Sequence, residues 1–260
     1  MEGVVSDFQR FQHFKEFIEI DYYAYFSKCY FALNAYIKVK FQDKKDREKI
    51  DQLKEDSTIQ NRFKELLDSD IFCSNLKDFK QNLYNAQIKN EDNVISFEKV
   101  KIQSFQNKNI LENNQPIKKN GITYILKIYS GKDEKISFEC KNTKETTLQE
   151  EIKCKYSELE TELNNTKLSK TQRDIIKSCF DKEIQQYNQN LMDTISNIEQ
   201  QKDTNYNLVY KGFVEILYQL RNALFHSEIN PKEENICKVY KFAYLLFKDF
   251  ICKLPTEDTK

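Results

Sequence analysis

The fold class is decided first by the stretch Tyr22-Tyr-Ala-Tyr-Phe-Ser-Lys-Cys-Tyr-Phe-Ala-Leu-Asn-Ala-Tyr36. It belongs to a segment, residues 6–40, in which apolar side chains recur mostly at steps of three or four residues. These side chains are Phe8, Phe11, Ile18, Tyr22, Tyr25, Cys29, Leu33 and Tyr36. Such steps place side chains on one face of an α-helix. Because the stretch is so aromatic, we expect one long helix, or two joined helices, deep in the core.

Outward from this stretch, the pattern remains mostly helical. Residues 42–56 are densely charged, and we interpret them as a solvated helix end or a linker. Residues 61–67 return to helical spacing, and residues 68–85 predict another helix with an inward apolar side. The inward side chains are expected to be Ile71, Leu76, Phe79 and Leu83.

The last part of the chain is also helical in pattern. Helical spacing returns at Thr147 and runs toward Leu163. A second helix is expected from Ser169 to about Glu199, because Ser169 and Gln172 have the spacing of a capping box at its start. A third helix covers residues 207–226.

One more amphipathic helix is expected to close the chain. The tetrapeptide Asn230-Pro231-Lys232-Glu233 is typical of a helix start, with Asn as the N-cap and Pro at the first helical position. The helix is expected to end near Leu254-Pro255. Only 4 glycines and 3 prolines occur in 260 residues, which also favours long helices over a turn-rich β sandwich.

The middle of the chain has a different periodicity. Residues 94–105 and 122–129 alternate apolar and polar side chains in part, which is typical of strands. Gly131-Lys132-Asp133 then predicts a turn before residues 136–140. We expect a small antiparallel β insertion of two or three strands within a mainly α, helical-bundle fold. The expected division is a first helical segment at 1–91, a β-rich insertion at 92–146 and a second helical segment at 147–260.

Composition limits the classes of function. Lys and Arg together number 41, as do Asp and Glu, and this balance argues mildly against a bulk DNA-binding protein. The seven cysteines contain no Cys-x-x-Cys pair, and only two histidines are present, so we expect reduced thiols, no metal site and no cofactor. No segment is apolar and long enough to span a bilayer, and the N-terminus lacks a signal-peptide core. We expect a cytoplasmic protein without membrane contact.

The segment that carries chemistry is Leu217-Tyr-Gln-Leu-Arg-Asn-Ala-Leu-Phe-His226. At 100° per residue, the apolar side chains Phe213, Leu217, Leu220 and Leu224 share a narrow arc. Asn222 and His226 lie almost opposite that arc, and Arg221 projects between the two faces. These three polar groups span roughly 140° of helix surface near its C-terminal end. They combine a phosphate-binding cation with a group that moves protons.

Arg221-Asn222-x-x-x-His226 resembles the Arg-polar-x-x-x-His signature of the HEPN superfamily (higher eukaryotes and prokaryotes nucleotide-binding domains). The motif ends a penultimate helix that one more helix follows, as in that family, and residues 22–36 look like the family's aromatic first helix. The resemblance covers about residues 6–90 and 147–254. It does not cover the β insertion.

The resemblance implies metal-independent cleavage of RNA, with Arg221, Asn222 and His226 as catalytic residues. A neutral imidazole can take the proton of the ribose 2′-OH, or protonate the leaving 5′-oxygen, near neutral pH. A guanidinium can bind the phosphate as its negative charge grows. Asn222 would orient the imidazole or contact the phosphate. The products would be a 2′,3′-cyclic phosphate and a 5′-hydroxyl, and DNA would not be cut.

The expected partners follow from the same resemblance. The chain has one such motif, and two-sided acid–base catalysis needs two histidines, so a symmetric homodimer with a composite active site is expected. The RNA would be tRNA or mRNA, and the setting that of a toxin or antiviral effector restrained by an antitoxin or regulatory protein.

Other interpretations remain open at this point. A helix C-terminus favours a histidine for electrostatic reasons alone, and Arg221 could simply form a surface ion pair. The chain would then be a non-catalytic HEPN-like module that binds RNA or a nucleotide, or acts as a scaffold. A third hypothesis is a regulatory subunit whose β insertion binds a nucleotide or another protein, although no Gly-rich phosphate loop is present.

Overall fold

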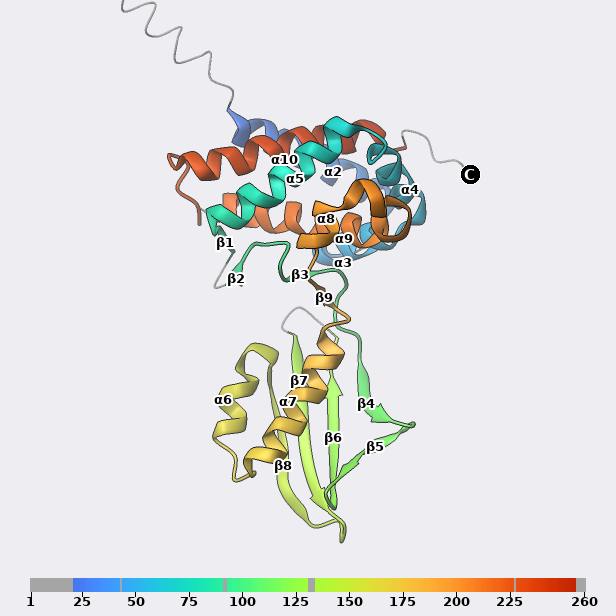
Figure 1. Cartoon of the computed structure of the whole chain (residues 1–260), viewed down its shortest axis with the longest axis vertical. Helices are drawn as coiled ribbons and strands as arrows, with labels where there is room; N and C mark the ends of the chain where they lie inside the picture. Colours follow the sequence, from blue (N-terminus) through green and yellow to red (C-terminus); the bar gives the residue numbers. More distant parts are fainter. Residues whose placement is uncertain (1–20, 43, 91–92, 131–133, 227, 256–260) are drawn as a thin grey trace, which may run out of the picture. The chain divides into compact units, whose positions relative to one another are not determined.

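A computed structural model describes residues 21–42, 44–90, 93–130, 134–226 and 228–255. The chain divides into two compact units (Figure 1). A buried apolar cluster formed within residues 105–187 is the core of the second unit. The helical unit contains the described residues up to Phe97 and from Met192 onward, and the sheet unit spans Glu98–Leu191. The fold is therefore mainly α with a small antiparallel sheet in the middle of the chain, as the sequence predicts.

The helical unit is built from seven helices and one short hairpin within the described residues. The elements are α2 (Tyr22–Lys40), α3 (Asp46–Glu55), α4 (Ser57–Leu66), α5 (Asp70–Ala86), β1 (Lys89–Asn90), β2 (Asn93–Val94), α8 (Met192–Ser196), α9 (Ile198–Phe225) and α10 (Glu234–Lys253). Helix α10 packs against both α2 and α5, and α9 packs against α3 and α4. Segments from the two ends of the chain thus share one core.

Helix α2 confirms the expected helix but buries a different stripe. Its buried side chains are Phe26, Tyr30, Leu33 and Ile37. Of the expected set, Leu33 is buried, whereas Tyr25 is 41% exposed. The helix is apolar on several sides, so its periodicity does not single out one face, and packing against α10 decides which residues are buried. The expected residues before position 21 lie outside the described part.

Helix α5 confirms most of its predicted inward side. Leu76, Phe79 and Leu83 are fully buried. Ile71 was expected to join them, and this is wrong, because its side chain is 73% exposed. Position 71 lies in the first turn of the helix and points about 100° away from its buried neighbour Phe72.

The last helix starts later than its sequence predicts. Asn230 does not cap α10, because its side chain instead accepts a hydrogen bond from the Lys232 backbone N–H at 3.2 Å. The Glu233 N–H bonds to the Asn230 carbonyl at 3.2 Å, so the tetrapeptide forms a turn. Helix α10 then begins at Glu234 and ends with Leu254 as its C-cap, as expected.

The sheet unit has more strands than expected. Its elements are β3 (Val100–Lys101), β4 (Lys108–Glu112), β5 (Gln115–Lys119), β6 (Ile122–Ile128), β7 (Lys135–Asn142), β8 (Thr147–Lys155), η1 (Tyr156–Glu158), α6 (Leu159–Asn164), α7 (Lys170–Ile184) and β9 (Asn188–Gln189). Strands β4 to β8 form a five-stranded antiparallel meander, and β3 pairs with β9.

Two tight turns set the register of this meander. Glu112 pairs with Gln115 across Asn113-Asn114, and Lys119 pairs with Ile122 across Asn120-Gly121. All four turn residues have positive φ, which matches a two-residue type I′ hairpin turn. These turns keep β4, β5 and β6 in close register.

One face of the meander forms the core of the sheet unit. Tyr124, Leu126 and Ile128 alternate along β6 and are at most 1% exposed. They join a cluster to which α7 contributes Ile176 and Phe180. Ser169 and Gln172 start α7 with reciprocal hydrogen bonds of 3.4 and 2.7 Å, which confirms the predicted capping box.

Three sequence expectations in this region differ from the structure. Residues from Thr147 were expected to be helical, but Thr147–Lys155 is strand β8, paired with β7. Leu148 and Ile152 have helical spacing, yet Leu148 is 44% exposed and the strand buries Cys154 instead. The helix expected from Ser169 to about Glu199 ends at Ile184, and β9, α8 and the start of α9 follow it. The sheet unit also contains α6 and α7, whose buried side chains pack on the sheet. Residues 94–105 form only β3 and the end of β2, and the predicted turn at 131–133 lies outside the described residues.

None of the helices in the described part of the chain combines the length and apolar character that a membrane crossing requires.

Candidate functional site

The residues singled out by the sequence lie at the C-terminal end of α9. Arg221 and Asn222 occupy its last turns, and His226 is the C-cap residue with φ −89° and ψ 6°. The His226 N–H bonds to the Asn222 carbonyl at 2.9 Å. The Glu228 N–H bonds to the Ala223 carbonyl, also at 2.9 Å, which closes the helix end. The three residues are thus held on a regular backbone.

Tyrosines from α2 and α10 fix this end of α9. The Tyr240 hydroxyl donates to the Leu220 carbonyl at 2.8 Å in a buried position. The ring of Tyr23 packs on that of Tyr240, with 4.8 Å between centroids. The Tyr23 hydroxyl donates to the Pro231 carbonyl at 3.1 Å, in the turn after the motif. The residue before Arg221 and the turn after His226 are therefore both tied to the core.

Arg221 lies between two aromatic rings. Its guanidinium carbon is 5.3 Å from the Tyr30 ring centroid and 5.0 Å from the Phe225 centroid. Its Nε is buried without a hydrogen-bond partner among the described residues. Ring faces attract a cation and accept N–H groups weakly, which offsets part of that loss. The guanidinium is therefore fixed in orientation by aromatic contacts.

Tyr30 is a neutral neighbour of this cation. Its side chain is 2% exposed, and burial raises the pKa of its hydroxyl, although the Arg221 charge opposes that rise. The phenol therefore stays protonated at neutral pH and supplies a π face to Arg221. No feature of the sequence assigned Tyr30 to the site, because a single sequence does not show that α2 contacts the end of α9.

Asn222 contacts Arg221 directly. Its Oδ1 accepts a hydrogen bond from Arg221 Nη1 at 2.9 Å. The sequence left open whether Asn222 orients the imidazole or contacts a phosphate. In the described structure it orients the guanidinium. Both side chains are half-buried.

His226 is the exposed member of the three. Its backbone is fixed by the helix end, and its imidazole has no side-chain hydrogen bond or ion pair within the described residues. One chain thus offers a fixed guanidinium and, one turn further on, a single imidazole open to solvent. This combination can bind an anion and exchange a proton.

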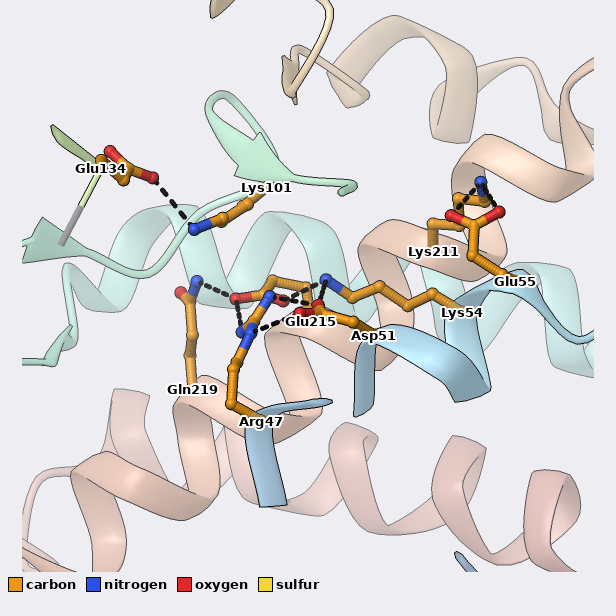
Figure 2. Close-up of polar contacts among 9 residues, drawn as sticks. All are labelled: Arg47, Asp51, Lys54, Glu55, Lys101, Glu134, Lys211, Glu215 and Gln219. Atoms are coloured by element: carbon orange, nitrogen blue, oxygen red, sulfur yellow. Dashed lines mark hydrogen bonds and ion pairs between the residues drawn. The ribbon is translucent and has the colours of Figure 1, made fainter. Parts of the chain in front are cut away.

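A buried ion network surrounds Glu215, which lies on α9 before the motif residues (Figure 2). Glu215 is 2% exposed and contacts Lys54, which is fully buried. Arg47 Nη1 donates to Glu215 Oε1 at 2.9 Å, and its Nη2 donates to Asp51 Oδ1 at 2.8 Å. Gln219 Nε2 donates to Glu215 Oε1 at 3.1 Å. Helix α3 therefore packs against α9 through charged groups.

The network holds Glu215 ionised. Burial alone would raise the pKa of this carboxyl, but Lys54 and Arg47 outweigh burial and lower the pKa to about 2. Arg47 also lies over the Tyr218 ring, 5.3 Å from its centroid. A buried carboxylate needs such partners, because an unpaired buried charge is very costly.

The network lies on the same side of α9 as two of the candidate residues. At 100° per residue, Glu215, Gln219, Asn222 and His226 fall within roughly 60° of arc. This side lies almost opposite the apolar arc of α9, yet Glu215 is buried there against Lys54 and Arg47 of α3. Residues 42–56 were interpreted as a solvated helix end or linker, whereas residues 46–55 form α3 and Arg47 is only 21% exposed. The acid within the apolar stretch Phe213-Val-Glu-Ile-Leu217 is the signal that could have indicated this network.

No metal-binding group is apparent elsewhere in the described residues, since none of their His, Cys, Asp and Glu side chains cluster in threes. All seven cysteines are free thiols. Two shallow surface hollows are lined by residues of α6, of α7 and of the C-cap of α7, among them Asp174 and Lys177, and neither includes a motif residue.

Comparison of the chain with protein-family models, with curated proteins and with solved structures found no match in any of the three.

Proposed function

We propose that this chain is a HEPN-like endoribonuclease that cuts RNA without a metal ion. The observation that carries the proposal is the fixed guanidinium of Arg221, hydrogen-bonded to Asn222, with the exposed imidazole of His226 about one turn away. A solvated helix end is usually covered by mobile lysines and glutamates. Here the cation is immobilised before any ligand binds, which favours phosphate recognition.

In the proposed reaction, neutral His226 takes the proton of the ribose 2′-OH. The 2′-oxygen attacks the adjacent phosphorus, and the bond from phosphorus to the 5′-oxygen breaks as that oxygen gains a proton. Arg221 contacts the non-bridging phosphate oxygens, whose negative charge grows in the transition state. The products are a 2′,3′-cyclic phosphate and a 5′-hydroxyl. DNA lacks the nucleophile and is not cleaved.

A second imidazole would complete this chemistry. The base and the acid act on opposite sides of the phosphorus, and one motif supplies one histidine. We therefore propose a homodimer in which His226 of each copy faces one shared site. Two arginines would also meet there, giving a local positive potential in a chain of zero net charge.

The proposed substrates are tRNA or mRNA in the cytoplasm, and the proposed role is that of a toxin or an antiviral defence effector. An RNase that stops translation must be restrained, so an antitoxin or a regulatory protein is the expected partner. The alternative is a HEPN-like module that binds RNA or a nucleotide as a scaffold without cutting it.

The test is cleavage of total tRNA and of a structured mRNA by the purified protein in EDTA, followed by analysis of the RNA ends. The wild type is expected to leave cyclic-phosphate and 5′-hydroxyl ends, and His226→Ala is expected to leave the RNA intact. His13→Ala is the matched control, because His13 is the only other histidine of the chain. This variant should cut like the wild type.

Two outcomes would contradict the proposal. Equal cleavage by wild type and His226→Ala would identify a contaminating nuclease. Binding of RNA by a folded wild-type protein without any cleavage would favour the scaffold alternative.

A further inference from the structure

Four π systems form a row at the end of α9. Tyr30 contacts the Arg221 guanidinium, which contacts Phe225. Phe225 in turn stacks with Phe31 of α2, with 6.2 Å between centroids and 19° between ring planes. The row begins in the core and reaches solvent, since Tyr30 is 2% exposed, Phe225 42% and Phe31 58%.

The outer end of this row is unusual for a surface. Single exposed apolar side chains are common and need no explanation. Two near-parallel exposed rings beside an immobilised cation are more specific. Aromatic rings and arginine planes are the groups on which unpaired nucleobases stack. The cation and one of the rings, Arg221 and Phe225, lie about one turn apart on the same helix.

We infer that Phe31 and Phe225 form a stacking platform for an unpaired nucleobase of an RNA strand whose phosphate contacts Arg221. The inference rests on the proposed function and adds the part of the substrate that the site selects. Every base has a π face, so the platform favours unpaired over paired nucleotides and discriminates weakly among bases. The base would belong to a nucleotide beside the scissile phosphate.

The charge of α2 favours RNA over a second copy as the occupant. Residues 22–40 contain three lysines and no aspartate or glutamate, although the whole chain has equal numbers of acids and bases. Lys28, one turn before Phe31, and Lys38 are exposed. A two-fold contact through this face would oppose lysines with lysines, whereas a phosphodiester strand complements them.

A fluorescence experiment tests the platform directly, because the chain contains no tryptophan. Phe31→Trp, made in the inactive His226→Ala chain, carries one indole at the outer end of the row. Titration with a single-stranded oligouridylate is expected to quench it as a base stacks. Ile71→Trp in the same background is the control, because Ile71 is 73% exposed on α5, away from the row. Its fluorescence should not change.

Three arms separate base stacking from other causes. An abasic strand of equal length has the phosphates without the bases, and it should not quench Phe31→Trp. A duplex should quench far less than the single strand. Phe31→Ala and Phe31→Leu should each weaken binding of labelled RNA by about tenfold, because neither provides a ring.

The failures are distinguishable. If labelled RNA does not bind at all, the proposed function fails and the platform with it. If RNA binds or the wild type cuts it, but the Phe31→Trp signal is unchanged or is quenched equally by the abasic strand, only the platform is overturned. If Phe31→Ala converts a dimer into a monomer in sedimentation velocity, the exposed rings are a subunit contact instead.

Discussion

At the scale of single residues, Arg221 is the most constrained group of the candidate site. Its guanidinium contacts Tyr30 and Phe225, and its Nη1 donates to Asn222. A planar, delocalised cation can satisfy the rings and the amide together, whereas a lysine ammonium cannot. Orientation is therefore set before substrate arrives, and the cost of ordering a long side chain is met in folding.

Tyr30 should act as a positioning residue through this contact. Tyr30→Phe keeps the ring and is expected to cut RNA at a rate within about threefold of the wild type. Tyr30→Leu keeps an apolar side chain without a π face, and its single-turnover rate at saturating RNA should fall by about tenfold or more. Rate at saturation, RNA affinity and melting temperature are measured for each variant.

Tyr36→Leu provides the matched control on the same helix, since Tyr36 is half-buried and contacts Lys40 instead. It should change the melting temperature without lowering the saturated rate. A rate loss in Tyr30→Leu that simply follows the loss of folded protein would show that Tyr30 only supports the core.

The sequence indicated these three motif residues but not their surroundings. Arg221, Asn222 and His226 stand close in sequence at a helix end, so helical geometry alone relates their positions. Tyr30 and Phe31 are about 190 residues earlier, and their contacts with α9 depend on how α2 packs. The buried stripe of α2 was also predicted incorrectly. A helix that is apolar on many sides has no preferred face in its sequence, so its packing decides which residues are buried.

At the scale of elements, α3 and α9 are joined partly by charged groups, beside a hydrogen bond from the Tyr210 hydroxyl to the Leu53 carbonyl. Glu215, Lys54 and Arg47 form the charged contact, and Gln219 extends it by one turn toward Asn222. A buried charged network does not by itself add stability, because desolvation offsets most of the attraction. It does penalise any shift of α3 along α9, since every such shift leaves a buried charge unpaired.

Acid should weaken this contact. The pKa of Glu215 falls from its ordinary 4.5 to about 2 on folding, so its ionised form stabilises the fold above about pH 4.5. Relative to the protonated carboxyl, the ionised form favours the fold by on the order of 3 kcal/mol, and this difference is lost as the pH drops from about 4.5 toward 2. Glu215→Gln lacks it, so the difference in unfolding free energy between wild type and variant should shrink over this range.

Urea unfolding at several pH values measures that difference. Glu55→Gln is the control, because Glu55 pairs with Lys211 at 2.7 Å but its side chain is 57% exposed. Exposed pairs contribute little, so this variant should follow the wild type closely at every pH. A gap between wild type and Glu215→Gln that stays constant down to about pH 2 would mean that the carboxylate is not held ionised in the fold.

At the scale of the whole molecule, the helical unit is discontinuous in sequence and the sheet unit is continuous. From a change in periodicity, the sequence predicted a mainly helical fold with a small antiparallel sheet in the middle of the chain, but α9 begins at Ile198, nine residues before its expected start. It placed the return to helix too early, because β8 is a charged edge strand whose pairing with β7 is not local information. Asn120-Gly121 is a strong local hairpin signal, which is why β5 and β6 are joined so tightly.

Because the sheet unit has its own buried cluster, a destabilising substitution in that cluster is expected to loosen the sheet unit and leave the helical unit folded. Phe138 is fully buried in the sheet-unit cluster, and Phe138→Ala is expected to cost that unit about 3–5 kcal/mol. Hydrogen exchange should then speed up in peptides of β6, β7 and β8. Protection in α9 and α10 should stay as in the wild type. Equal loss of protection in both units would show that they unfold as one.

A shared active site makes a quantitative prediction about mixtures of chains. If both copies of His226 act on one phosphate, a mixed dimer of wild type and His226→Ala has an acid or a base but not both. Co-refolding the two chains at varied ratios should then give RNA cleavage that falls with the square of the wild-type fraction. A site complete within one chain would give a linear fall.

Ile71→Ala replaces His226→Ala as the control, since this exposed side chain lies outside the site and its mixtures should keep full activity. A linear dependence, measured on material that sedimentation shows to be dimeric, would place the second proton-transfer group within the same chain and remove the reason for a composite site.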